Sequence, residues 1–161
     1  RVVGVLTHDN PLYDALTGYE NLKFVGRMYG LDRIDERIEG VATQMGLSAR
    51  LHQRTGILSH GMRKRLSIAR VILHDPSILL MDEPENGLDP EALEMLEEVI
   101  SSSVASYRTV LMTTHNLERG LALGQRMAIM ARGRIAYQES LDSLGLDAVK
   151  NAYLHHTEGV L

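Results

Sequence analysis

The sequence contains no cysteine and no tryptophan, and only one phenylalanine. The absence of cysteine excludes disulfide bonds and thiolate metal sites, and it fits a reducing compartment. No apolar run approaches the length of a membrane span and no signal-peptide pattern is present, so we expect any membrane association to go through a partner. With 44% apolar residues among 161, the chain should fold around a core of leucine, isoleucine, valine and methionine.

The chain also has no excess of positive charge, because its formal net charge is -4. The only dense basic cluster runs from Arg63 to Arg65, whereas binding to a phosphate backbone needs positive charge spread over a surface. We therefore expect no nucleic-acid partner. The chain begins at Arg1 inside an apparent strand, "VVGVL", and we interpret it as a piece whose N-terminal part is absent.

The apolar spacing predicts an α/β fold. A capping box, Thr17 with Glu20, opens one helix, and a second helix is expected to stop at Gly46. Downstream, short apolar runs alternate with helices, and "RMAIMARGRIAYQ" is typical of a hairpin turning at Arg132-Gly133. Alternating apolar strands and helices predict a parallel sheet covered on both faces, and the tail from Asp142 should add one more helix.

The stretch "ILSHGMRKRLSIAR" joins a loop of small and polar residues to a helix expected to start near Met62. Its free backbone N–H groups would point into Ser59-His60-Gly61, where Gly61 permits close approach of the main chain and Ser59 offers a hydroxyl. This junction suits an anion such as phosphate. The alternative is an ordinary helix cap by Ser59 beside a solvated basic turn.

The strand "SILLMDEP" ends in two adjacent carboxylates, Asp82 and Glu83. Parallel sheets bind ligands at this carboxyl edge, where one carboxylate can support Mg²⁺ and its neighbour can act on an attacking water. Alternatively, both acids merely end a strand and meet solvent. Two further features favour a site: Asp89 is placed to cap the helix that starts at Pro90, and the strand "TVLMTTH" ends in His115, which could face the same ligand.

Together these motifs resemble the nucleotide-binding domain of ATP-binding-cassette (ABC) proteins. "LSHGM" resembles the signature loop, "ILLMDEP" the Walker B strand, "NGLD" the D-loop and "TTH" the strand of the switch histidine, in family order and spacing from about Val3 to Gln138. The resemblance implies ATP and Mg²⁺ as ligands. It implies that Ser59 and Gly61 contact the γ-phosphate of ATP held by the opposite subunit, with His60 between them in the nucleotide-binding loop. It further implies Asp82 supporting Mg²⁺, Glu83 as general base, His115 as sensor of the γ-phosphate, and Asp89 in nucleotide binding and in communication across the dimer.

Three positions depart from the family pattern. His60 and Met62 stand in the signature loop where glycine and glutamine are common, and His8 occupies the Q-loop position, where an imidazole could still bond a water near Mg²⁺ with a charge that depends on pH. The phosphate-cradling G-x-x-x-x-G-K-[ST] loop is absent, and "GILSHGMR" from Gly56 lacks the required lysine and hydroxyl. We therefore expect the 161-residue chain alone to be inactive.

By this resemblance the chain is one P-loop NTPase (RecA-like) domain piece: a helical signature subdomain over 9–57, the signature loop and half of the parallel-sheet core over 58–138, and a tail over 139–161. The complete protein would be the ATP-hydrolysing subunit of an exporter on the cytoplasmic face of the membrane, in a homo- or heterodimer bound to a membrane permease. The stretch "LERGLALGQRMAIMARGRIAYQ" looks most like haem exporters of cytochrome c maturation, with lipid or drug exporters as alternatives. Two alternatives remain. One is a soluble non-transport ATPase, against which the segment 9–57 shows no sustained heptads for a long coiled coil. The other is a binding module without activity.

Overall fold

The computed structural model describes residues 2–7, 12–105, 108–142 and 144–157, with the side chains of 103–105 left aside. The chain divides into two compact units, Arg1–Thr113 and Thr114–Leu161, and each is described by itself. Within the described residues, no helix is both long and apolar enough to cross a membrane. The boundaries at 57/58 and 138/139 stay predictions.

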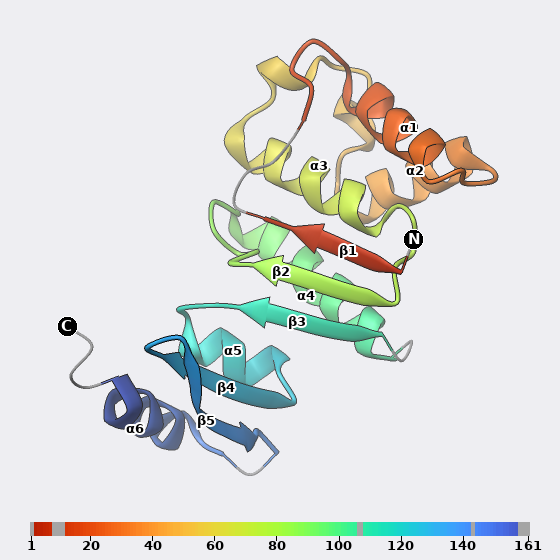
Figure 1. Cartoon of the computed structure of the whole chain (residues 1–161). Helices are drawn as coiled ribbons and strands as arrows, with labels where there is room; N and C mark the ends of the chain where they lie inside the picture. Colours follow the sequence, from red (N-terminus) through yellow and green to blue (C-terminus); the bar gives the residue numbers. More distant parts are fainter. Residues whose placement is uncertain (1, 8–11, 106–107, 143, 158–161) are drawn as a thin grey trace. The chain divides into compact units, whose positions relative to one another are not determined.

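The first unit combines a helical segment with a three-stranded parallel sheet of order β1-β2-β3 (Figure 1). Parallel strands need long crossover connections, and here helices supply them. In chain order the elements are β1 (Val3–Leu6), α1 (Gly18–Met28), α2 (Ile34–Gln44), the short 3-10 helices η1 (Ser48–Arg50) and η2 (Thr55–Ile57), α3 (His60–Ile72), β2 (Ile78–Asp82), α4 (Pro90–Ala105) and β3 (Thr109–Thr113). The predicted α/β fold with a parallel sheet is confirmed.

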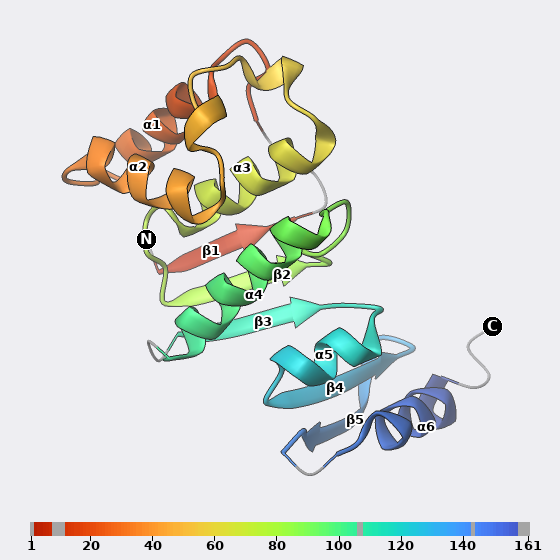
Figure 2. The same ribbon diagram turned by 180° about the vertical axis from the view of Figure 1, so that it is seen from behind.

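Helices α3 and α4 pack against one face of this sheet. On that face Gly4 pairs with Leu79, and a methyl group at Gly4 would lie 3.0 Å from Val71 of α3, so β1 and α3 are in close contact. Figure 2 shows α4 running in front of the strands when the sheet is viewed from behind. Leu79 is fully buried between the strands and the helices.

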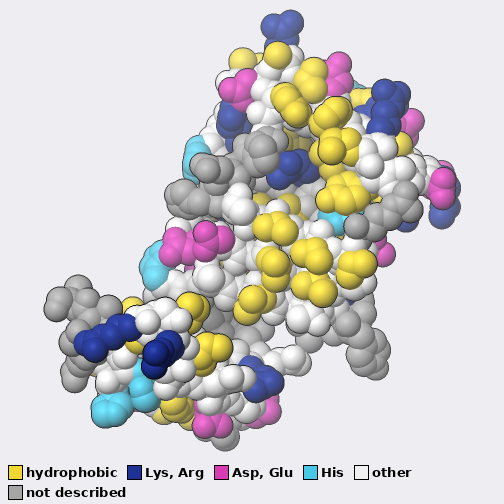
Figure 3. Space-filling model, viewed as in Figure 1, with side chains coloured by type: hydrophobic (Ala, Val, Ile, Leu, Met, Phe, Trp, Pro, Cys, Tyr) yellow, Lys and Arg dark blue, Asp and Glu magenta, His cyan; other side chains and the backbone are white. Residues whose placement is uncertain are grey.

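The opposite face of the sheet differs from the prediction of two covered faces. Val3, Val5 and Leu111 lie on this face and are 39%, 47% and 65% exposed. Figure 3, viewed from the same side as Figure 1, shows hydrophobic side chains gathered over this region. The strand sequences are apolar on both faces, and a continuous apolar run predicts a strand that is covered on both faces. In this chain one of the two apolar faces is exposed.

The helical segment forms as the sequence predicts. Thr17 and Glu20 make a complete capping box at the start of α1, with the Thr17 N–H donating to Glu20 Oε2 at 2.8 Å. Helix α2 ends before Gly46, whose φ of +62° is the left-handed conformation that favours glycine after a helix. Asn21 ties the segment together, since its buried amide donates to Thr55 Oγ1 at 3.0 Å.

The second unit is built around a two-stranded antiparallel sheet. Its elements are α5 (Leu117–Leu123), β4 (Arg126–Ala131), β5 (Arg134–Ser140) and α6 (Leu146–Thr157). Arg132 and Gly133 form the two-residue turn with φ values of 52° and 75°, the pair of positive angles that a type I′ hairpin requires. The predicted hairpin and the predicted helix of the tail are both confirmed.

Candidate functional site

The two strand-end carboxylates lie at the carboxyl edge of the parallel sheet. Asp82 is the last residue of β2 and pairs in register with Thr113, the last residue of β3. The Thr113 hydroxyl donates to Asp82 Oδ1 at 2.6 Å, and the Glu83 N–H donates to Thr113 Oγ1 at 3.0 Å. Sequence reasoning did not single out Thr113, although its place in "TTH" beside an acid-tipped strand could have indicated it.

Glu83 has a strained backbone and an anchored side chain. Its φ of 42° lies in the left-handed region, which costs a residue with a side chain on the order of 1 kcal/mol. The Asn86 amide donates to Glu83 Oε2, which fixes the carboxylate over the turn that follows β2. The surrounding structure must maintain this conformation, and such maintained strain is common at functional sites.

The loop Ser59-His60-Gly61 caps α3, which begins at His60, two residues before the predicted start at Met62. The Ser59 hydroxyl accepts from the Met62 N–H at 3.3 Å, so the ordinary capping role predicted as an alternative is present in the structure. Ser59 and His60 are exposed, which leaves the hydroxyl and the start of the helix accessible to a ligand.

This loop lies against the segment that follows the acids. A methyl group at Gly61 would be 3.7 Å from the Gly87 carbonyl, and one at Gly87 would be 2.5 Å from His60 Nε2. With a φ of 77° as well, Gly87 admits no larger residue without strain. The structure therefore brings Ser59-His60-Gly61 together with 87–89.

Asp89 caps α4 as predicted, and it also forms an ion pair that was not predicted. Its Oδ1 accepts from the Ala92 N–H at 2.8 Å, and both of its oxygens accept from Arg65 Nη2, at 2.7 and 2.8 Å. These hydrogen bonds, that from Ala92 first, hold the pKa of Asp89 below its usual range. Asp89 is thus engaged within its own chain.

Lys64 of α3 is a second buried cation near the acids. Only 3% of the residue is exposed. Burial lowers the pKa of Lys64, while the negative charges of Glu85, Asp82 and Glu83 oppose that shift. A cation from α3 thereby offsets part of the repulsion among the acids at the end of β2.

The predicted site also includes two histidines, His8 and His115. His8 falls outside the described residues. His115 belongs to the second unit, and β3 ends at Thr113 rather than at His115 because its pairing with β2 stops at Asp82. The roles of both histidines stay predictions.

The residues of the site fit a Mg²⁺ ion that takes its remaining ligands from water and from the phosphates of a substrate. Within the described parts of the chain, no cluster of three or more histidine or carboxylate side chains could hold a metal ion. Proteins usually bind Mg²⁺ through one or two carboxylates, several waters and the phosphates of a substrate. Asp82, an exposed carboxylate oriented by Thr113, matches that requirement.

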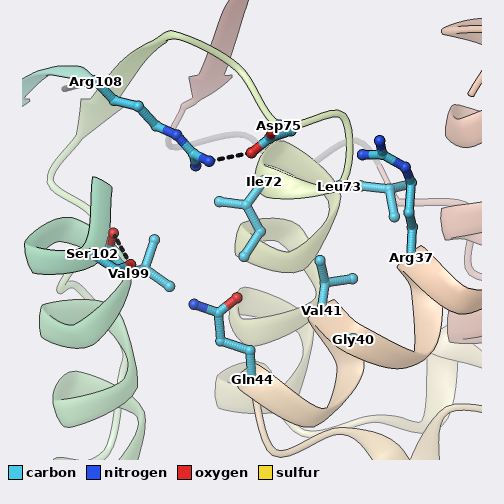
Figure 4. A pocket seen from close by; sticks show the side chains of 10 residues that line it. All are labelled: Arg37, Gly40, Val41, Gln44, Ile72, Leu73, Asp75, Val99, Ser102 and Arg108. Atoms are coloured by element: carbon cyan, nitrogen blue, oxygen red, sulfur yellow. Dashed lines mark hydrogen bonds and ion pairs between the residues drawn. The ribbon is translucent and has the colours of Figure 1, made fainter. Parts of the chain in front are cut away.

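A hollow of about 350 Å³ between α2, α3 and α4 is separate from this site (Figure 4). Asp75 and Arg108, which line it, form an ion pair that joins the connections preceding β2 and β3. These connections stand at the amino ends of the strands, whereas Asp82 and Glu83 stand at or just beyond a carboxyl end. The hollow therefore lies away from the acids.

Comparisons with known proteins agree with the arrangement of these motifs. The sequence profile described as "ABC transporter" matches residues 1–86. The chain is 37% identical over 145 residues to the ABC transporter ATP-binding protein NatA of Bacillus subtilis (strain 168), covering 88% of this chain and 59% of that protein. It is 35% identical over 155 residues to the Nod factor export ATP-binding protein I of Cupriavidus metallidurans (strain ATCC 43123 / DSM 2839 / NBRC 102507 / CH34), covering 92% and 51%.

A solved structure described as "Structure of ATP binding subunit of ABC transporter" superimposes with a TM-score of 0.84 at 25% identity, over 94% of this chain and 68% of that one. The chain spans about half the length of the curated relatives it matches. The profile match, the relatives and the shared fold lead to one conclusion: this chain belongs to the ABC transporter family and carries part of its ATP-binding domain.

Proposed function

We propose that this chain is part of the ATP-binding subunit of an exporter, which hydrolyses ATP to drive transport across the cell membrane. The observation that carries the proposal is that one unit contains both the strand-end acids and the exposed loop at the start of α3. The Asp82 carboxylate is oriented by Thr113 and that of Glu83 by Asn86. The exposed Ser59-His60-Gly61 loop lies against 87–89. Carboxylates can support a metal ion and activate water, and an anion-binding helix start can hold phosphate, so a unit with both is suited to a dimer that hydrolyses a phosphoanhydride.

Each group would then have one task. Glu83, fixed by Asn86, would accept the proton of the attacking water, and Asp82 would hold Mg²⁺. The ion would supply positive charge that offsets the negative charge of the phosphates. Ser59 and the first backbone N–H groups of α3 bind the γ-phosphate of a nucleotide held by a second subunit.

The proposed partners are a second ATP-binding subunit, identical or related, and an integral membrane permease that holds the subunit at the cytoplasmic face. Export is the proposed direction because the name of one relative, the Nod factor export ATP-binding protein I, states it for that protein. None of the relatives named above is called a haem exporter, and the prediction of haem export rests on 117–138 alone. A soluble non-transport ATPase stays the second candidate.

The test compares the protein expressed from the complete gene with the 161-residue chain. We expect the complete protein to hydrolyse ATP with a turnover number on the order of 1 per second that is abolished by removal of Mg²⁺, since positioning and charge neutralisation provide most of the catalysis. We expect calorimetry of the 161-residue chain to detect no binding at micromolar ATP, because the chain contains no G-x-x-x-x-G-K-[ST] loop. Micromolar affinity of the chain, or a complete protein that does not hydrolyse ATP, would contradict the proposal.

A further inference from the structure

The hollow of about 350 Å³ described above opens where α2 and α4 diverge (Figure 4). The end of α2 lies close to α4, since a methyl group at Gly46 would be 2.8 Å from Met95 Cε. Farther from this contact, Gln44 and Val41 of α2 face Val99 of α4 across the open space. The volume lies at the lower end of the range for ligand pockets, so the hollow suits a small molecule.

The wall of the hollow on α2 contains a glycine inside a helix. Such a glycine lowers helix stability relative to alanine, because it loses more conformational freedom on folding. At Gly40 no close packing requires this loss, since a methyl group there would meet no atom within 4 Å. Gly40 does line the hollow, where a larger side chain would occupy part of the open space. The glycine therefore keeps this wall open.

Part of the lining of the hollow is apolar. Ile72 and Leu73 at the end of α3, together with Val99, are buried residues that line it. A polar group placed against these side chains would lose its water without gaining a hydrogen bond, which is unfavourable. The part of a ligand that contacts them should therefore be hydrocarbon.

Two arginines give another part of the lining a positive charge. Arg108 pairs with Asp75, and these side chains are 26% and 60% exposed. Arg37 of α2 is exposed and forms no ion pair with another described residue. Figure 4 shows the two guanidinium groups on either side of Asp75. Two positive charges and one negative charge leave the lining with a net charge of +1, which favours an anion that accepts charge-assisted hydrogen bonds.

We propose that the hollow between α2, α3 and α4 is a binding site for a small organic carboxylate. The hydrocarbon part of the ligand lies on the buried apolar side chains, and its carboxylate binds Arg37 and Arg108. The apolar lining favours this ligand over inorganic phosphate, and the net positive charge favours it over a neutral molecule. The ligand competes with Asp75 for Arg108, so Asp75 limits the affinity. This inference does not rest on the proposed function, because the site is separate from the acids of the candidate site.

The measurement is calorimetric titration of the complete protein, without nucleotide, with octanoate, 1-octanol or inorganic phosphate. We expect octanoate to bind with a dissociation constant on the order of 1 mM, as for a ligand of few atoms. Octanol lacks the charge and phosphate lacks the hydrocarbon part. Each should therefore bind at least about tenfold more weakly, which is the effect of losing one charged hydrogen bond or a comparable apolar contact.

Variants of α2 locate the bound octanoate. Gly40→Leu should weaken binding at least about tenfold by filling the space, whereas Gly40→Ala should bind as the parent does. Both should melt about 2 °C above the parent, since each removes a helical glycine, so a loss of binding in Gly40→Leu is not a loss of folding. Arg37→Gln should weaken binding about tenfold. Its control is Arg27→Gln, an exposed arginine of α1 that is not among the residues lining the hollow.

Asp75→Asn is expected to have the opposite effect. The φ of Asp75 is 55°, a conformation that asparagine also adopts readily, so the backbone should be preserved. The change removes the charge that competes for Arg108 and repels the ligand. Octanoate should therefore bind about twofold to fivefold more tightly, in the range of a partly exposed ion pair.

Several results would overturn the proposal. One is a parent that does not bind octanoate, or that binds octanol equally well. Another is an unchanged affinity in both Gly40→Leu and Arg37→Gln, which would mean that octanoate binds elsewhere on the protein. If Gly40→Leu does not fold, Arg37→Gln and Asp75→Asn decide by their opposite shifts in affinity. ATP hydrolysis enters none of these outcomes, so failure of the proposed function would leave the test intact.

Discussion

Replacing Glu83 by glutamine should lower the turnover number of the complete protein on the order of a hundredfold or more while preserving nucleotide binding, as the loss of a general base implies. The amide keeps the size of the side chain and can still bond to Asn86, but it cannot accept a proton from water. Single-turnover hydrolysis and fluorescent-nucleotide binding, measured on the same preparation, report the two quantities separately.

Glu94→Gln is the matched control for this prediction, because Glu94 is an exposed glutamate of α4. We expect that variant to hydrolyse ATP at the parental rate. If Glu83→Gln also turns over ATP at the parental rate, Glu83 serves the structure of the turn after β2 and the general base lies elsewhere.

The second large effect is expected from Leu12→Asp combined with Tyr13→Asp. Tyr13 is 55% exposed, its ring meets Phe24 edge-on at 5.4 Å, and Leu12 and Leu16 are half-buried beside it. Tyr13 and Phe24 also line a hollow of about 480 Å³ next to Met28, itself 70% exposed. This patch fits the family resemblance, in which a short cytoplasmic helix of the membrane subunit docks after the Q-loop.

We expect the purified double variant to keep near-parental ATPase activity but to lose co-purification with the membrane subunit, by on the order of thirtyfold for a central contact. Tyr153→Asp is the control, because Tyr153 is a 44% exposed tyrosine of the second unit. Unfolding of the variant would support the alternative, in which Leu12, Tyr13 and Leu16 belong to the core. Normal assembly and transport would remove the patch from the mechanism.

Local sequence was sufficient to predict features that neighbouring residues determine. The Thr17–Glu20 capping box, the Arg132-Gly133 turn and the start of α4 after Asp89 each depend on residues within a few positions of one another, and all three are confirmed. The end of α2 before Gly46 is of the same kind, since a glycine with positive φ stops a helix locally.

Features that depend on tertiary register could not be predicted in the same way. Thr113 meets Asp82 only because β2 and β3 pair in one particular register, and Arg65 meets Asp89 only because α3 packs beside the start of α4. A spacing of 24 residues between two charges gives no pairing signal in a single sequence. The proposed role of the 59–61 loop likewise involves a second subunit, which the sequence of one chain does not describe.

The central claim is that this loop acts on a nucleotide held by another subunit, and the mass of the complete protein in ATP and Mg²⁺ tests it most directly. Glu83→Gln is expected to slow hydrolysis and so to accumulate the ATP-bound state. Light scattering should then give twice the subunit mass, falling to the single mass without nucleotide. Adding Ser59→Asp retains a good cap for Met62 but opposes phosphate with a negative charge, so this double variant should keep the single mass in ATP. A mass that does not depend on ATP in Glu83→Gln, or a doubled mass that survives Ser59→Asp, would contradict the account.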